Sequence, residues 1–176
     1  MEVFANGWIS DEEFEEFERL YKDALKSDAE LDLPEAQYAV SEFCIGDAVF
    51  QSEIRKRYAK EAMQAGVTDA AYLFDEICKS ESYTNGETWS FENTIKVYAI
   101  VADNTTGSML GWIQDCVADG YLDGEGVFPK DIAKAIYYYT LAAQNGNSSA
   151  KSTLELIQRN PESFGFGSLK KARYIS

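Results

Sequence analysis

The sequence contains no histidine. Without an imidazole ring, Ser-His and Cys-His nucleophiles, histidine general bases and most zinc sites are excluded. The chain also lacks the G-x-S-x-G nucleophile motif and the phosphate-binding P-loop. Pairs of Asp and Glu side chains can perform acid–base hydrolysis, but no spacing in this chain distinguishes one pair from the rest. We therefore expect that the protein is not an enzyme, and a carboxylate-based hydrolase or a small-ligand binder is the weakest of three alternatives.

Cysteines and long apolar runs are also scarce. The chain has three cysteines, Cys44, Cys78 and Cys116, an odd number at wide spacing. This pattern does not predict a disulfide framework, and reduced thiols are typical of the cytoplasm. No segment approaches the roughly 20 apolar residues that cross a membrane, and residues 1–11 lack the basic and apolar stretches of a signal peptide. We expect a cytoplasmic protein with no membrane partner.

Basic residues are too few to balance the acidic ones. The chain has 30 Asp and Glu against 16 Lys and Arg, a net charge of −14. Residues 1–47 alone hold 14 acidic and three basic side chains. Such a charge repels nucleic acid and anionic lipid and attracts a cationic protein. The alternative is that the charge only keeps the protein soluble.

Three residue types recur along the chain at one constant spacing, which we call the repeat interval. The recurring positions are Tyr58, Tyr98 and Tyr138; Ala62, Ala102 and Ala142; and Gly46, Gly86 and Gly126. Each alanine follows its tyrosine by about one turn of a helix. The agreement of three positions indicates an internal repeat.

Each repeated unit is expected to contain two helices, because apolar residues recur at steps of three and four. The first helices are predicted at 34–44, 70–79 and 108–122, and the second helices at 52–65, 91–103 and 132–145. A last helix, Ser148–Arg159, stops before Pro161. Gly66 and Gly146 suit left-handed helix ends, and Asp131 suits an N-cap.

Residues 11–27 form a further predicted helix ahead of the repeats. Ser10 and Glu13 make a capping box at its start, and apolar residues between positions 14 and 25 line one face. The opposite face is mostly acidic and carries Glu12, Glu15, Glu16, Arg19 and Asp23.

The third unit contains a longer motif. Its residues are Tyr121, the turn Gly124-Glu125-Gly126-Val127, Asp131, Lys134-Ala135, Tyr138, Ala142-Ala143 and Gly146. In this order the unit resembles a Sel-one-like repeat, a relative of the tetratricopeptide repeat. The other units match less well, since Thr106 stands where the resemblance implies a glycine, and Cys44 and Cys78 stand where it implies tyrosines.

The helical periodicity predicts an all-α fold, and the resemblance implies a short right-handed α–α solenoid of antiparallel helix pairs. We expect one domain over residues 1–176. An acidic N-terminal helix occupies 1–33, helix pairs occupy 34–69, 70–107 and 108–147, and a capping helix and tail occupy 148–176.

Four acidic residues near the third turn raise the alternative of a calcium site. They are Asp119, Asp123, Glu125 and Asp131. Their spacing lacks the D-x-D-x-D-G pattern of an EF-hand loop, and Asp123 and Asp131 also suit helix ends. We expect no metal and no cofactor.

In solenoids the first helices of the units usually line the concave face on which a partner docks. Within 108–122, Trp112, Asp115 and Asp119 share one stripe that combines an aromatic side chain with charge. The predicted partner-binding residues are these three together with Glu12, Glu15, Glu16 and Asp23. The alternatives are that Trp112 only packs against a neighbouring helix and that the N-terminal acids form an ordinary solvated face.

The leading hypothesis is a cytoplasmic protein-binding module for a cationic protein, and in its most concrete form an immunity protein. Such a protein would neutralise a bacterial toxin by occluding its active surface. Toxins that attack nucleic acid tend to be basic, so an acidic inhibitor would associate faster. The resemblance implies adaptor activity, so a regulatory or assembly adaptor is the second alternative. The oligomeric state stays open.

Overall fold

The computed structural model describes residues 33–43, 48–124 and 128–164, together with the helical positions Glu15, Arg19, Asp23 and Ser27. These residues contain seven α-helices and no strand, which confirms the all-α prediction for the described part of the chain. The helices are α2 (Pro34–Phe43), α3 (Ala48–Gln64), α4 (Thr68–Thr84), α5 (Phe91–Tyr98), α6 (Leu110–Asp123), α7 (Ile132–Gln144) and α8 (Ser148–Arg159), followed by the 3₁₀ helix η1 (Pro161–Phe164).

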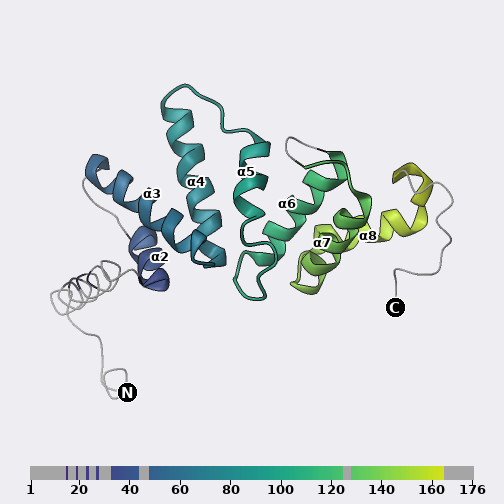
Figure 1. Ribbon diagram of the computed structural model, residues 1–176, viewed down its shortest axis with the longest axis horizontal. Helices are drawn as coiled ribbons and strands as arrows, with labels where there is room; N and C mark the ends of the chain where they lie inside the picture. The colour runs from purple at the N-terminus through teal and green to yellow at the C-terminus, as the bar shows by residue number, and fades with distance from the viewer. Residues whose placement is uncertain are drawn as a thin grey trace, which may run out of the picture.

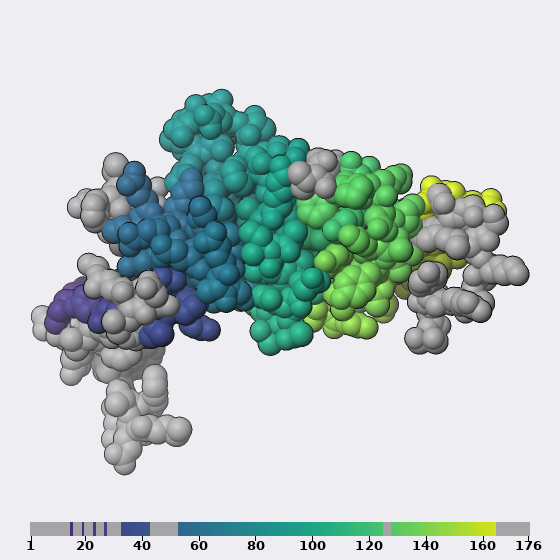
Figure 2. Space-filling view, viewed as in Figure 1, coloured from purple at the N-terminus to yellow at the C-terminus, as the bar shows by residue number. Residues whose placement is uncertain are grey.

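The helices follow one another in chain order along the long axis of the molecule (Figure 1). Each packs against the next, from α2 and α3 to α7 and α8, and α4 also contacts α2 and α6. The surface keeps the same order, with the colours passing from blue through teal to green along its length (Figure 2). Tertiary contacts are therefore made mainly between neighbouring helices.

The predicted helix ends agree with the structure least well in α4. This helix continues to Thr84 instead of ending at Lys79. Glu81 in the added turn pairs with Lys56 of α3, so a contact with the neighbouring helix holds the extension. No local apolar pattern marks that contact in the sequence, which is why the prediction was too short.

The helix predicted over 91–103 is shorter than expected, because α5 ends at Tyr98. The next residues form tight turns, and the Val101 amide donates to the Tyr98 carbonyl at 3.1 Å. Nε2 of Gln114 in α6 donates to the Ala102 carbonyl at 2.9 Å. Val101 and Ala102 are fully buried. Packing against α6 thus replaces the last turn of the predicted helix.

The core extends along the row of helices. Its central cluster includes the fully buried Ile95, Tyr98 and Ile113, and a second cluster joins α6, α7 and α8. A close approach occurs at Gly111, where an added Cβ would lie 2.9 Å from the Asn145 carbonyl oxygen. Only a glycine lets α6 approach the end of α7 this closely.

Polar side chains join the turn between α3 and α4 to the turn between α5 and α6. Thr68 Oγ1 donates to the Thr106 carbonyl at 2.6 Å, and Asn104 Nδ2 donates to the Gly66 carbonyl at 2.7 Å. Both pairs of residues are 38 apart in the chain. Gly66 has φ of +99°, as expected for its left-handed helix end.

Asp69 of α4 caps the start of α6. Its carboxylate accepts from the backbone amides of Ser108 at 3.1 Å and Met109 at 2.9 Å. The residue at the N-cap of α6 makes no side-chain cap of its own. One helix of the row therefore satisfies the free amides at the start of another.

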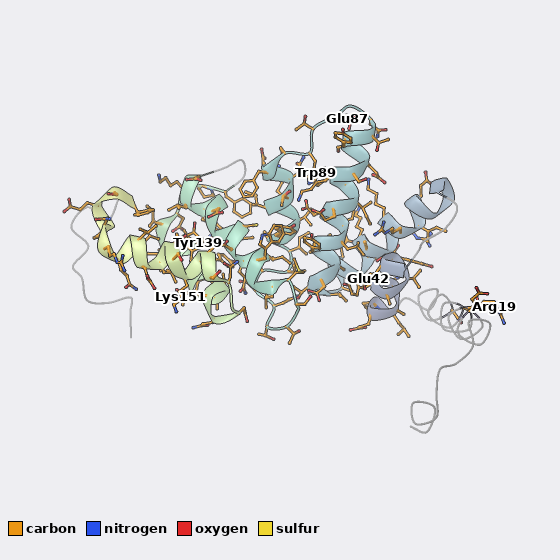
Figure 3. All side chains as sticks on the ribbon, turned by 180° about the vertical axis from the view of Figure 1, so that it is seen from behind. Arg19, Glu42, Glu87, Trp89, Tyr139 and Lys151 are labelled. Carbon is orange, nitrogen blue, oxygen red and sulfur yellow. The ribbon has the colours of Figure 1, made fainter. Side chains whose placement is uncertain are left out.

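The Asp75 carboxylate of α4 is fully buried and has four hydrogen-bond donors. Oδ1 accepts from Trp89 Nε1 at 2.7 Å and from Thr94 Oγ1 at 2.8 Å. Oδ2 accepts from the Tyr98 hydroxyl at 2.7 Å and from the Lys79 ammonium at 2.8 Å. A buried charge is stable only when it is paired in this way. Asp75 thus ties α4 to α5 and to the connection between them, on which Trp89 lies (Figure 3).

We predict that Asp75→Asn destabilises the protein by about 2–4 kcal/mol, because it removes the charge that holds these donors in a buried site. Urea unfolding followed by circular dichroism measures the loss. Asp123→Asn, at the exposed end of α6, is the matched control and is expected to change the free energy of unfolding by less than about 0.5 kcal/mol. Equal stabilities of the two variants would contradict the role of Asp75.

Candidate functional site

Trp112 lies near the start of α6 and stays 37% exposed. Its ring makes edge-to-face contacts with Tyr72 of α4, at 5.4 Å between centroids, and with Tyr98 of α5, at 5.2 Å. Tyr98 is in turn held by Asp75. Trp112 therefore packs against neighbouring helices and also presents a surface to solvent, so both sequence-based interpretations describe part of its environment.

Asp115 lies one turn further along α6, and only 9% of it is exposed. Its Oδ1 is buried and has no hydrogen-bond partner. Burial raises the pKa of Asp115 to about 6, the nearby charge of Asp119 raises it as well, and a hydrogen bond from the Asn147 side chain opposes the rise. Asp115 is thus a poorly satisfied carboxyl group and not the exposed contact that its place in the stripe suggests.

Asp119 is half-buried and accepts a hydrogen bond from the Tyr139 hydroxyl of α7. Burial raises the pKa of Asp119, and the charge of Asp123 adds to the rise, while the bond from Tyr139 lowers it. Figure 3 shows Tyr139 in the packed region that α7 shares with its neighbours. The stripe on α6 therefore brings together one exposed aromatic ring and two carboxyl groups that are poorly solvated.

The N-terminal half of the predicted surface is only partly described. Glu15 and Asp23 are exposed helical positions, and Asp23 accepts from Arg19 Nη1 at 3.1 Å. Glu12 and Glu16 lie outside the described residues. Their part in a binding surface stays a prediction.

The two described cysteines are poor nucleophiles. Cys78 and Cys116 are buried and free. Burial raises the pKa of both thiols, and that of Cys116 reaches about 12. Little thiolate is present at neutral pH under these conditions.

The acids of the calcium alternative do not converge where they are described. Asp131 caps α7 by accepting from the Lys134 amide at 3.0 Å, Asp119 binds Tyr139, and Glu125 lies outside the described residues. Across residues 33–43, 48–124 and 128–164, no three His, Cys, Asp or Glu side chains form a group suited to a metal. The same part of the chain has no helix with the length and apolar character to cross a membrane.

Sequence reasoning missed the buried carboxylate of Asp75. A signal for it was present, because Asp75 and Asp115 stand one repeat interval apart, as do Tyr72 and Trp112. Two residues of the candidate site on α6 therefore lie one repeat interval after residues of α4, one of which is the buried Asp75.

No protein-family model and no curated protein matches this chain. The features of the chain that indicate a function are the chemistry of the α6 stripe and the excess of negative charge.

We predict that Asp115→Asn stabilises the protein at neutral pH. An unfolded Asp has a pKa of about 3.9, and folding raises that of Asp115 to about 6. The folded state therefore binds this proton more tightly, so wild-type stability falls as the pH rises through this interval. Asparagine does not titrate. The variant should exceed the wild type by about 1–3 kcal/mol near pH 8 and by much less near pH 4.

Urea unfolding of both proteins between about pH 4 and pH 8 measures this difference. Glu155→Gln, which removes an exposed acid from α8, is the control and should show no such gain. An Asp115→Asn variant that is less stable than the wild type near pH 8 would show that the carboxylate is satisfied.

Proposed function

We propose that the chain is a binding module for a cationic protein and that the partner docks on the face formed by α4 and α6. Trp112 carries this proposal. Its ring is 37% exposed, is positioned by two tyrosines, and lies on the same stripe as Asp115 and Asp119. A rigid, exposed aromatic side chain beside charge has the composition of a binding hot spot.

The charge of the chain supports a cationic partner. If every Lys and Arg paired with one acid, 14 acidic side chains would still have no basic partner. Several described ion pairs, such as Arg19–Asp23 and Arg57–Glu61, also join residues of a single helix. These pairs do not involve the acidic residues of the α6 stripe, Asp115 and Asp119. The excess charge would speed the approach of a basic protein and favour one orientation of docking.

We further propose that the helices form a short right-handed solenoid of antiparallel pairs, of the Sel-one-like kind. The bonds between turns 38 residues apart support this arrangement. The positive φ angles of Gly66 and Gly146, which are two repeat intervals apart, support it as well. In such a solenoid α4 and α6 are first helices of successive units. The concave face that they line is the usual docking face.

The most specific form of the proposal is an immunity protein that occludes the active surface of a basic bacterial toxin in the cytoplasm. An assembly or regulatory adaptor could use the same face. Activity of the partner separates the two, because an immunity protein abolishes it at equimolar ratio and an adaptor leaves it intact.

We predict that Trp112→Ala weakens binding of the native partner about 30-fold or more, since it removes the exposed anchor of the docking face. The partner is first captured from source cells with the wild-type chain and identified by mass spectrometry. It is then purified and titrated calorimetrically. Tyr137→Ala, which removes an aromatic side chain of α7 that is 53% exposed, is the control and should bind normally. Similar losses in both variants, or an acidic partner, would refute the proposal.

We also predict that changing Glu12, Glu15 and Glu16 together to lysine slows association with the same partner and flattens its salt dependence. The reason is loss of long-range attraction, which acts before contact. Stopped-flow or surface-based kinetics at several salt concentrations measures the rate. A second triple variant carries lysine at the exposed positions Glu53, Glu87 and Glu155 and changes the net charge equally. If both variants associate equally fast, the N-terminal acids have no specific part.

A further inference from the structure

Asp75 of α4 and Asp115 of α6 occupy equivalent positions, one repeat interval apart. Both are at least nine-tenths buried, with exposed fractions of 0% and 9%. Asp75 is bonded by four donors from its own chain. Asp115 leaves Oδ1 without any partner. The two carboxylates occupy equivalent positions, but one is fully hydrogen-bonded and the other is not.

Three of the four donors are replaced by other residues in the third unit. The positions equivalent to Lys79, Trp89 and Thr94, one repeat interval later, hold Asp119, Pro129 and Lys134. Asp119 is itself an acid, and proline has no side-chain donor. Lys134 is a donor, but its Nζ lies 4.9 Å from the centre of the Tyr121 ring.

The fourth donor is retained in sequence and used elsewhere. Tyr138 corresponds to Tyr98, but its hydroxyl donates to Asp103 at 3.0 Å. The third unit therefore keeps the acid and has lost or redirected every donor that satisfies it in the middle unit.

An unpartnered, buried carboxylate oxygen destabilises a folded protein. Asp115 keeps 9% of its surface exposed. Its negative charge is shared by both carboxylate oxygens, so a donor from outside the chain that bonds the exposed part would stabilise the whole group and offset the cost of leaving Oδ1 without a partner.

The neighbours of Asp115 favour one chemical class of ligand. Asp119 supplies a second carboxylate one turn further on, and Trp112 supplies an exposed indole one turn before. The two aromatic contacts of Trp112 have interplanar angles of 81° and 70°, so neither tyrosine stacks parallel to the indole. A guanidinium group is planar, stacks on aromatic rings and offers several N–H donors to carboxylates.

Two other cations fit less well. An ammonium group lacks the planar surface that stacks on indole. Calcium requires about six or more oxygen ligands, and the described residues gather no group of three candidate ligands.

We propose that the α6 face binds an arginine side chain of the partner protein, with Asp115 and Asp119 accepting hydrogen bonds from the guanidinium and Trp112 stacking against it. This inference rests on the proposed function, because it names the group of the cationic partner that occupies the docking face. Charge complementarity with a chain of net charge −14 favours the same occupant.

The test compares two short peptides of equal length and charge, one with arginine and one with lysine at the same positions. The purified full chain is titrated with each by calorimetry. NMR follows the Asp115 carboxyl carbon and the Trp112 indole N–H during the titration. The arginine peptide is expected to bind about tenfold more tightly and to shift both signals.

Variants of α6 assign the effect to the site. Asp115→Asn is expected to weaken the arginine peptide about tenfold or more, and Asp119→Asn provides a second variant with the same expectation. Glu155→Gln removes the acid at the equivalent position of α8, one repeat interval after Asp115, and should bind normally. Circular dichroism of each variant confirms that it is folded.

The outcomes separate this inference from the proposed function. Equal binding of the arginine peptide by wild type and Asp115→Asn would overturn the arginine site and leave the docking face in place. Equal affinities for the two peptides would overturn the choice of arginine. Movement of the Asp115 and Asp119 signals by Ca²⁺ alone would overturn it in favour of a metal. Normal binding of the native partner by Trp112→Ala would instead refute the proposed function.

Discussion

The buried Asp75 carboxylate is the interaction on which the middle of this molecule depends. The helix that it holds, α5, has only eight residues, and a helix this short gains little stability from its own hydrogen bonds. Asp75 ties it to α4 through Thr94 and Tyr98. The same tyrosine contacts Trp112 at 5.2 Å. A structural charge in one helix therefore helps to position the exposed aromatic side chain of the candidate site in another.

A second constraint comes from the chain-order arrangement of the helices. Each helix packs mainly on its neighbours, so no single core stabilises both ends at once. Polar contacts between turns add to the apolar ones at each junction. Asp69 caps α6, and Asn147, at the start of α8, donates to the Gly111 carbonyl at 3.1 Å. These contacts set the spacing between α4, α6 and α8, and hence the shape of the face on which Trp112 lies.

Local periodicity predicts most of the described helices, because an apolar stripe and a glycine end are local properties of a sequence. It fails at the ends of α4 and α5, where Lys56 and Gln114 from other helices decide where each helix stops. The stripe of Trp112, Asp115 and Asp119 follows from helical spacing in the same way. The solvent exposure of these side chains does not follow from helical spacing, because the burial of Asp115 depends on how the chain around Asn147 packs against α6. For Asp75 the repeat interval marks the position but not the bonds, since two of its four donors, Thr94 and Tyr98, lie 19 and 23 residues away in the chain.

If Asp115 binds the partner as we propose, one repeat position serves stability on α4 and recognition on α6. Helices α6, α7 and α8 are joined by other contacts, including the burial of Tyr139 and Ile157 in one cluster and the stack of Tyr121 on Tyr138 at 5.8 Å. These contacts connect the helices without Asp115. Asp115 is already largely desolvated in the free protein, so a cation that reaches it gains the attraction with little further loss of water from this carboxylate at the moment of binding. On this proposal, the free energy lost by burying an unsatisfied acid in the free protein is recovered only with a partner whose donor reaches Asp115, so the same residue would contribute to specificity.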